Sequence, residues 1–567
     1  MKKQPDFDAV VVGAGVTGMY QTYRLREAGF NVKGIDGSSG VGGSWHVNRY
    51  PGCRVDSESH TYSYFWNPEL LEEFNWTELF ASQPEVLRYL NRAADYMDIR
   101  KDYMFNTRIK KSVWDEENQY WVIHLEEGGA APLTTRYLFS AMGPLSAPQM
   151  PRIDGVHTFR GEMHHTGRWP RDPNGFGGAP VDFKGKRVGV VGTGASGVQV
   201  IQEAAKEAGE LYVFQRSPNW CTPLGNRKFS DADMAEIKSQ YEEINELCET
   251  TLSGFAHKWI DKSALEVSDE EREATFEKLY YGPGFSFWLG TFKDVLYDKR
   301  ANDYATDFVR RKIRSRVKDQ KIADKLIPTD HGYGTRRVPL ETNYFEVYNQ
   351  DNVTLVDLKE TPIERVTPKG IKTGDDEYEL DILIWATGFD AIVGSLGRVD
   401  IVGEKGVTLK EAWADGVQTY LGLQIVGFPN LFTLIGPQNG TVFCNLPRCS
   451  VTAIDWITQL MVDARAEGAT RIEPTRQAQH DWNELCHELL GHSLLGSTNS
   501  WFTGVNNNIP GRQVRQVLFY AGGNPKFKAL CKDIRDDDYR GFIFSDAGDK
   551  GGGKPSASAR EAETVTG

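Results

Sequence analysis

The chain has 567 residues, which is too long for one hydrophobic core, so we expect two or three domains. Its formal net charge of −13 argues against nucleic acid as a partner, because phosphate backbones are bound by broad basic surfaces. The sequence contains no run of 18 apolar residues and no secretory apolar segment after Met1. We therefore expect no membrane partner and a cytoplasmic location.

The cysteines are few and scattered. An odd number without any C-x-x-C pair indicates neither a disulfide framework nor a zinc site. We therefore expect all of them to be reduced thiols without redox chemistry, and we expect no bound metal. The seven cysteines are Cys53, Cys221, Cys248, Cys444, Cys449, Cys486 and Cys531.

The first predicted unit is a strand, a glycine turn and a helix near the N-terminus. Residues 7–12 are apolar and β-branched, and helical periodicity runs over 19–28. A second strand at 31–35 ends at Asp36, whose carboxylate can accept hydrogen bonds from ribose hydroxyls but would repel a 2′-phosphate. The unit therefore predicts a site for FAD or NAD. The glycines of its G-x-G-x-x-G motif are Gly13, Gly15 and Gly18.

The same pattern recurs after the strand-like residues 187–191. Two copies, each between a strand and a helix, predict two dinucleotide sites with the pyrophosphate at a helix N-terminus. The second strand of this unit ends at Arg216, and a guanidinium can hold a 2′-phosphate through two parallel hydrogen bonds, which favours NADPH. Two such nucleotides on one chain indicate that NADPH reduces a flavin. The residues expected to line the second turn are Gly192, Thr193, Gly194, Ser196 and Gly197.

The remaining segments complete an α/β fold with two Rossmann-like dinucleotide-binding domains and a helical insertion. Charged, amphipathic stretches predict that the insertion covers 229–329. A tail at 546–567, rich in Gly, Ser, Ala and charge, is expected to be disordered. The domain boundaries that we expect are 1–150 and 385–545 for the FAD domain, and 151–228 and 330–384 for the NADP domain.

A third motif, F-x-G-x-x-x-H-x-x-x-W-P, lies between the two glycine turns. It resembles the signature of type I Baeyer–Villiger monooxygenases, class B flavoproteins, and the resemblance extends over about 8–523. Related N-hydroxylating and flavin-containing monooxygenases lack the Trp-Pro pair. From its residue type alone His165 could be a core histidine or a pH-sensitive hinge, whereas the resemblance implies that it couples cofactor binding to domain movement. The motif residues are Phe159, Gly161, His165, Trp169 and Pro170.

The resemblance also implies roles for individual residues. Arg337 matches the family's arginine beside the flavin, and Asp56 matches its active-site aspartate. Arg336 matches the residue that helps Arg216 to hold the 2′-phosphate, and Trp501 matches a contact residue on a mobile loop over NADP, where we expect an exposed ring. The segment 385–390 resembles a hinge between domains. Further flavin contacts are implied for Gly43, Ser44, Trp45 and Tyr50, and a ketone pocket for Phe443, Cys444 and Asn445.

The implied activity explains why such an arginine is needed. Reduced FAD adds O2 to form a C4a-peroxide, and a fixed positive charge stabilises both this anion and the oxyanion formed when it attacks a ketone. A neighbouring carboxylate holds the guanidinium in place and offsets its burial. We therefore expect an NADPH- and O2-dependent monooxygenase (EC 1.14.13) that converts ketones to esters or lactones, as a monomer or weak homo-oligomer.

Three other functions use the same two-nucleotide scaffold. An N-hydroxylating or sulfur-oxygenating monooxygenase is disfavoured by Trp169, Pro170 and Arg337. A disulfide reductase is disfavoured because the sequence contains no C-x-x-C pair. A nonenzymatic NADP-binding redox sensor would bind the nucleotides without forming an oxygenated product.

Overall fold

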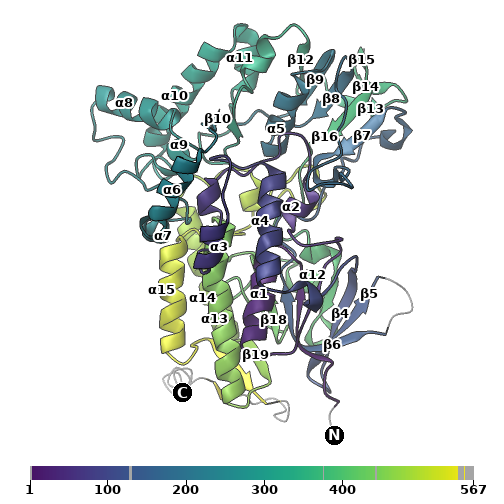
Figure 1. The fold of residues 1–567 in the computed structure, drawn as a ribbon, viewed down its shortest axis with the longest axis vertical. Helices are drawn as coiled ribbons and strands as arrows, with labels where there is room; N and C mark the ends of the chain where they lie inside the picture. The colour runs from purple at the N-terminus through teal and green to yellow at the C-terminus, as the bar shows by residue number, and fades with distance from the viewer. Residues whose placement is uncertain (1–2, 127–130, 375, 441–443, 547–553, 556–567) are drawn as a thin grey trace.

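The structure is a computed structural model that describes residues 3–126, 131–374, 376–440, 444–546 and 554–555. Two sheets lie at opposite ends of an elongated molecule (Figure 1). The expected α/β class with two Rossmann-like units is confirmed. None of the helices in these ranges is long and apolar enough to cross a membrane.

The first sheet has eight strands within the described ranges, and its centre is parallel. The N-terminal strand lies between two parallel partners, so the residues after it reach the carboxyl edge of the sheet, where nucleotides bind. Antiparallel strands extend the sheet on one side. The spatial order is β17 (Asp400–Val402), β4 (Ile109–Asp115), β5 (Tyr120–Leu125), β6 (Leu133–Ser140), β1 (Phe7–Val12), β2 (Val32–Ile35) and β3 (Tyr103–Met104), with β18 (Leu431–Thr433) also paired to β6.

The second sheet is parallel throughout its five described strands. The small antiparallel sheet β13 (Ile363–Val366), β14 (Gly370–Thr373) and β15 (Asp376–Glu379) lies beside it in Figure 1. The strand of the second sheet that comes last in the sequence ends at Trp385, so this residue belongs to the second sheet rather than the first. The spatial order is β12 (Val353–Asp357), β9 (Glu210–Gln215), β8 (Arg187–Val191), β16 (Ile382–Trp385) and β7 (Glu162–His165).

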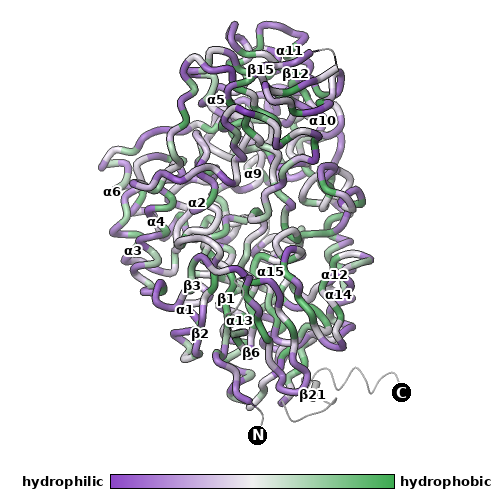
Figure 2. The backbone as a smooth tube through the Cα atoms, turned by 90° about the vertical axis from the view of Figure 1, so that its right-hand side faces the viewer, coloured by the Kyte–Doolittle hydropathy of each residue, from purple (hydrophilic) through white to green (hydrophobic). Residues whose placement is uncertain are grey.

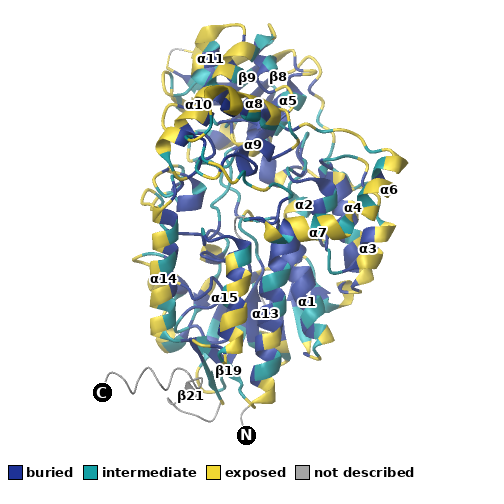
Figure 3. Ribbon diagram, turned by 90° about the vertical axis from the view of Figure 1, so that its left-hand side faces the viewer, coloured by how far each residue is buried: buried dark blue, intermediate teal, exposed yellow. Residues whose placement is uncertain are grey.

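Helices bury the sheet faces. α1 (Val16–Glu27) follows the first glycine turn and packs against α13 (Leu446–Ala466), a long helix from the C-terminal part of the chain. Hydrophobic residues are concentrated along β1, β6 and α13 (Figure 2), and the buried residues surround α1 and α13 (Figure 3). Further helices are α2 (Ser44–Val47), α3 (Pro68–Glu73), α4 (Gln83–Tyr96), α5 (Ala195–Ala204), α12 (Leu409–Ala412), α14 (Arg476–Gly491) and α15 (Asn524–Asp536).

The helical insertion forms between the second unit's first and last strands and lies at the upper left of Figure 1. Side-chain caps begin its helices: the Ser230 hydroxyl accepts from the amide of Asp233, and Asp298 accepts from the amide of Arg300. Figure 3 shows that α6, α8 and α10 expose their outer faces. The helices are α6 (Asp231–Ser239), α7 (Tyr241–Thr250), α8 (Asp269–Tyr280), α9 (Ser286–Leu289), α10 (Lys299–Arg316) and α11 (Gln320–Leu326).

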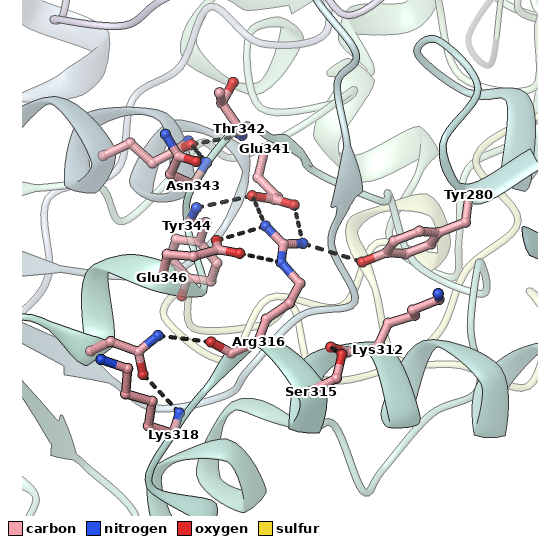
Figure 4. Close-up of polar contacts among 12 residues, drawn as sticks. Tyr280, Lys312, Ser315, Arg316, Lys318, Glu341, Thr342, Asn343, Tyr344 and Glu346 are labelled. Atoms are coloured by element: carbon pink, nitrogen blue, oxygen red, sulfur yellow. Dashed lines mark hydrogen bonds and ion pairs between the residues drawn. The ribbon is translucent and has the colours of Figure 1, made fainter.

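A buried ion pair fixes the insertion to the second nucleotide-binding unit (Figure 4). Arg316, the last residue of α10, donates to both carboxylate oxygens of Glu341, at 2.6 and 3.0 Å, and it also donates to Glu346. The Glu341 side chain is fully buried in β11 (Leu340–Glu341), which pairs with β10 (Thr222–Pro223). Because β11 begins three residues after Arg337, this network also fixes the strand next to the candidate catalytic arginine.

The C-terminal tail lies mostly outside the described residues, and the expected disorder over 546–567 stays a prediction. Lys554–Pro555 nevertheless forms a short strand, β21, against β20 (Phe542–Ser545). β20 pairs in turn with β19 (Arg471–Pro474). These two residues therefore add a short third strand to this edge.

Candidate active site

The first glycine turn forms a backbone cradle at the carboxyl end of β1. A Cβ at Gly18 would lie 1.8 Å from the Gly13 carbonyl oxygen, and one at Gly13 would lie 2.3 Å from the carbonyl of Ala141. Gly13 also has φ +117°, a conformation that side-chain-bearing residues rarely adopt. Helix and strand are therefore in direct backbone contact, as a bound pyrophosphate requires.

A cavity of about 490 Å³ begins at this turn. Asp36 lies in its wall, where the carboxylate accepts hydrogen bonds from the amides of Ala14 and Ser38, each at 2.6 Å. Trp45 also lines the cavity and donates through its indole N–H to the Tyr62 hydroxyl at 2.9 Å. The cavity thus extends from a ribose-reading carboxylate to an aromatic wall. Other predicted residues that line it are Gly13, Gly15, Gly43 and Ser44.

Tyr50, predicted to lie against the flavin, has its hydroxyl directed toward the second unit, and its flavin contact stays a prediction. It is not among the residues that line the cavity described above. Its buried hydroxyl donates to the side chain of Gln199 on α5 at 2.7 Å. Tyr50 therefore joins the two nucleotide-binding units in this arrangement.

The second glycine turn repeats the first. A Cβ at Gly197 would lie 2.1 Å from the Gly192 carbonyl oxygen, while one at Gly194 would meet no atom within 4 Å, so Gly194 faces open space. Ser196 begins the helix side of the turn and is half-buried. The Thr193 hydroxyl donates to the carbonyl of Ser217 at 3.0 Å, which joins the turn to the residue after Arg216.

The two arginines predicted to read the 2′-phosphate differ in their partners. Arg216 is exposed and donates to the side-chain oxygen of Asn508 at 2.7 Å. Arg336 forms an ion pair with Asp330 at 2.8 Å. The hydrogen bond from His331 and the charge of Arg336 hold the pKa of Asp330 well below its usual value, so this carboxylate stays charged. Arg216 has no such carboxylate partner within the described ranges, so its charge is available to an anion.

Trp501 begins a short 3-10 helix, η8 (Trp501–Thr503), in the segment that also contributes Asn508. The expectation of an exposed ring is wrong, because Trp501 is half-buried and the centre of its ring lies 4.2 Å from the ring centre of Phe502. Its loop is held to the hinge segment by Asn506, which donates to the carbonyl of Phe389 at 3.2 Å.

The fingerprint residues lie where the chain passes between the two units. β7, which ends at His165, forms the edge of the second sheet beside β16. The His165 Nδ1 accepts from the amide of Gly167 at 3.0 Å, and its Nε2 lies 3.4 Å from the Thr387 hydroxyl in the hinge segment. Burial lowers the pKa of His165 to about 4, so the ring is neutral near pH 7. A neutral ring at that pH argues against a pH-sensitive hinge.

The rest of the fingerprint packs around this passage. Trp169 is buried, stacks 4.5 Å from the ring of His164 and donates to the carbonyl of Ala179 at 3.2 Å. The next residue, Pro170, accepts from the amide of Ala179 at 2.8 Å. A Cβ at Gly161 would lie 2.5 Å from the ring of Phe159, so this glycine allows the aromatic side chain to fold over it.

Arg337 and Asp56, although 281 positions apart in the sequence, form an ion pair with 2.5 Å between the guanidinium NH2 and the carboxylate Oδ2. Both side chains are only partly exposed. The guanidinium carbon lies 4.5 Å from the ring centre of Phe285 and 5.5 Å from that of Trp288, both from the helical insertion. Three parts of the chain therefore meet at one positive charge.

Sequence reasoning missed Phe285 and Trp288, because nothing in the short aromatic run 285–288 indicates a partner nearly fifty residues away. Trp288 also donates to the carbonyl of Gly334 at 2.9 Å, which ties the insertion to the segment carrying Arg337. Gly334 has φ +76°, the left-handed conformation that favours glycine.

The expected ketone-pocket segment is partly described. Phe443 lies outside the described residues. Asn445 is buried and donates to the carbonyl oxygen of Thr61 at 3.1 Å, a few residues after Asp56. Leu446, the first residue of α13, lines the cavity that begins at the first glycine turn. Asn445 thus connects the segment 436–445 to the neighbourhood of Asp56.

The expectation that every cysteine is reduced is wrong for one pair. Cys444 and Cys449 form a disulfide with a Cα–Cα distance of 6.1 Å. Cys444 lies just before α13 and Cys449 lies in its first turn, so the start of the helix brings together two thiols five positions apart. The search for a C-x-x-C pair could not detect this spacing. The other five cysteines are free and buried.

Known proteins resemble the chain over almost its whole length. A family model described as pyridine nucleotide-disulphide oxidoreductase matches residues 7–282. The 2-oxo-Δ3-4,5,5-trimethylcyclopentenylacetyl-CoA monooxygenase of Pseudomonas putida is 48% identical over 95% of this chain and 98% of its own length. Phenazine N-monooxygenase PhzNO1 of Lysobacter antibioticus is 41% identical over 95% of this chain and 97% of its own length.

A crystal structure of OTEMO in complex with FAD and NADP superposes with a TM-score of 0.92 and 48% identity, and the match covers 96% of this chain and 100% of the other. Sequence matches at 40% identity include a protein named Baeyer–Villiger monooxygenase, from Pseudooceanicola batsensis. Family resemblance, two nucleotide-binding units and the fingerprint motif agree, and the chain belongs to the Baeyer–Villiger monooxygenases.

Proposed function

We propose that the protein is an NADPH- and O2-dependent monooxygenase that converts ketones to esters or lactones, with FAD in the first nucleotide site and NADP in the second. The Arg337–Asp56 ion pair carries this proposal, because it supplies a fixed positive charge between the two units. The relatives support the reaction class, and a related structure holds both nucleotides.

The residues present fit both nucleotides. Gly13 and Gly18 leave a backbone cradle that any Cβ would fill, and Asp36 supplies a ribose-binding carboxylate in the wall of the same cavity. At the second turn Gly194 opens onto free space, and Arg216 offers an uncompensated charge to a 2′-phosphate. When bound, the flavin accepts hydride from NADPH and activates O2 for transfer to the substrate.

Arg337 stabilises negative charge on the reacting oxygen and on the carbonyl oxygen of the substrate. Asp56 orients the guanidinium, and its charge offsets the cost of placing a cation in a partly buried site. The faces of Phe285 and Trp288 shield the guanidinium from water, which strengthens its electrostatic effect. In this proposal Arg337 is the catalytic residue and Asp56 positions it.

The ketone pocket is proposed to include Cys444 and Asn445 beside the turn that carries Asp56. Cyclic ketones are the first substrates to test, because the name of the Pseudomonas putida relative contains a 2-oxo-cyclopentenyl group. We also expect a cytoplasmic protein without nucleic-acid partners that is a monomer or a weak homo-oligomer. Size-exclusion chromatography with light scattering measures its oligomeric state.

The direct experiment incubates the FAD-loaded protein with NADPH, ¹⁸O2 and a panel of cyclic and linear ketones, followed by mass analysis of the products. We expect an ester or lactone that contains one ¹⁸O atom per NADPH oxidised. Arg337→Ala should abolish this product while flavin reduction by NADPH persists more slowly. A matched control is Arg365→Ala, which removes an exposed arginine on β13.

The same panel separates the alternatives. An aromatic N-heterocycle and a thioether test N-oxygenation and sulfoxidation, and the N-monooxygenase relative makes the first of these arms necessary. NADPH oxidation that yields only hydrogen peroxide with every substrate would contradict the proposal. A protein that binds NADP but never accepts FAD would favour the sensor.

A further inference from the structure

A buried contact between a carboxylate and an imidazole lies two residues after Asp56. The carboxylate Oε1 of Glu58 is 2.9 Å from Nε2 of His257, and the two side chains are 6% and 10% exposed. Glu58 precedes the short helix η1 (Ser59–Thr61) of the first unit, whereas His257 comes from the helical insertion. Neither residue belongs to the two nucleotide sites or to the Arg337–Asp56 ion pair.

The electrostatics of the site favour a charged Glu58. Burial raises the pKa of its carboxyl, but the nearby imidazole groups of His257 and His60 outweigh this effect and leave the pKa below its ordinary value. In the described part of the chain, the second oxygen, Oε2, has no hydrogen-bond partner, and neither do Nδ1 of His60 and Nε2 of His257, so the 2.9 Å approach of Nε2 to Oε1 is a close contact rather than an aligned hydrogen bond. The contact with His257 is therefore the closest compensation that the structure gives to this buried charge.

Two chains of contacts connect the pair to the candidate catalytic charge. On one side Glu58 belongs to the same turn as Asp56, and the carbonyl oxygen of Thr61 on this turn accepts a hydrogen bond from Asn445. On the other side a Cβ at Gly284 would lie 3.3 Å from Glu58 Oε1, so the insertion backbone passes close to the carboxylate. The next residue, Phe285, faces Arg337.

We propose that Glu58 and His257 are positioning residues: their buried carboxylate–imidazole contact holds the insertion against the 56–61 turn and so keeps Asp56 and the ring of Phe285 in place around Arg337. This inference rests on the proposed function, because it assigns the pair a role in oxygen transfer. Breaking the pair should loosen the Arg337 site while the nucleotide sites, built on the glycine turns, remain intact.

The test compares Glu58→Gln and His257→Gln with the wild-type holoenzyme. We expect flavin reduction by NADPH and NADP affinity to stay near wild type, while ester formed per NADPH oxidised falls about tenfold and hydrogen peroxide rises. This lies within the ~100-fold loss that a misplacement of about 1 Å can cause. A purely structural role would lower flavin reduction and ester formation together.

The double variant Glu58→Gln, His257→Gln replaces the carboxylate and the imidazole by two amides that can hydrogen-bond to one another. Because the two residues act as a unit, its loss should be smaller than the product of the two single losses. The control is Glu271→Gln, which removes the exposed insertion ion pair with Lys262 and should leave the ester yield unchanged.

Several outcomes overturn the inference. Wild-type ester yield in both single variants would do so, and so would a parallel loss of flavin reduction. Variants that fail to fold or to retain FAD would show a general structural role and would equally contradict it. Failure of the wild-type protein to form any ester would instead contradict the proposed function, so the two failures are distinguishable.

Discussion

Replacing Arg216 by alanine should change the coenzyme preference of the protein more than its catalysis. Arg216 is exposed at the end of β9 and contacts the neutral side chain of Asn508, whereas Arg336 is already paired with Asp330. The uncompensated guanidinium of Arg216 should therefore provide the larger share of 2′-phosphate recognition. The Arg336→Ala variant should therefore lose less of its kcat/KM for NADPH than the Arg216→Ala variant.

The expected loss of kcat/KM for NADPH follows from the hydrogen bonds that Arg216 makes to the 2′-phosphate. A hydrogen bond to a charged group contributes about 1.5–3 kcal/mol, and exposure to solvent places this site at the lower end. Because about 1.4 kcal/mol corresponds to a factor of ten, Arg216→Ala should lower kcat/KM for NADPH about 10- to 100-fold. NADH lacks the phosphate, so its kcat/KM should change by less than about threefold.

Steady-state kinetics with both coenzymes measures the effect, with Arg365→Ala as the matched surface control on the same unit. Raising the ionic strength should narrow the difference between wild type and variant for NADPH, since exposed charges are screened. An equal loss with NADH and NADPH would refute the reasoning, because it would show that Arg216 supports the fold or the nicotinamide rather than the 2′-phosphate.

Three other changes have definite expected outcomes. Gly18→Ala should abolish FAD binding, measured as flavin absorbance per protein, because its Cβ would lie 1.8 Å from a backbone oxygen, while Gly397→Ala, with no atom within 4 Å, should keep the flavin. Arg316→Met leaves two carboxylates unpaired, one of them fully buried, so the free energy of unfolding should fall by about 3–5 kcal/mol. Arg311→Met, which breaks an exposed pair, should cost at most about 1 kcal/mol in the same denaturant titration. His165, whose pKa burial lowers to about 4, stabilises the native state above about pH 6.5 and loses this contribution as the pH falls from about 6.5 toward 4, because the unfolded chain binds the proton first. His165→Asn should therefore flatten the dependence of stability on pH in this interval, and an unchanged slope would contradict the assignment.

The nucleotide sites were predictable because each depends on a short stretch of backbone. A G-x-G-x-x-G turn requires glycine at fixed offsets, and the carboxylate or arginine that reads the ribose follows at the end of the next strand. Asp36 lies in the cavity wall, and Arg216 directly follows β9, the corresponding strand of the second unit, which ends at Gln215. The Arg337–Asp56 contact was expected only through family resemblance, since spacing alone does not relate residues 281 positions apart.

Other features depended on packing that no local window records. Trp501 looks like a loop residue in the sequence, yet its ring packs against the core through Phe502. Cys444 and Cys449 lack the spacing of a redox motif, yet the start of α13 brings them together. Tyr50 lies next to the segment matched to the flavin site but reaches the other unit. In each case the direction of a side chain depends on how a loop meets a distant helix.

The sequence by itself determined that two dinucleotides bind, which of them carries a 2′-phosphate and which residues form the two turns, because these properties follow from backbone conformation and charge within about thirty residues. Only the tertiary structure decided which side chains of the insertion contact Arg337. Phe285 and Trp288 come from the helical insertion, whereas Asp56 lies on a turn of the first unit. Their contacts exist only after three separately encoded parts of the chain have packed together, and close packing rather than local preference selects those neighbours.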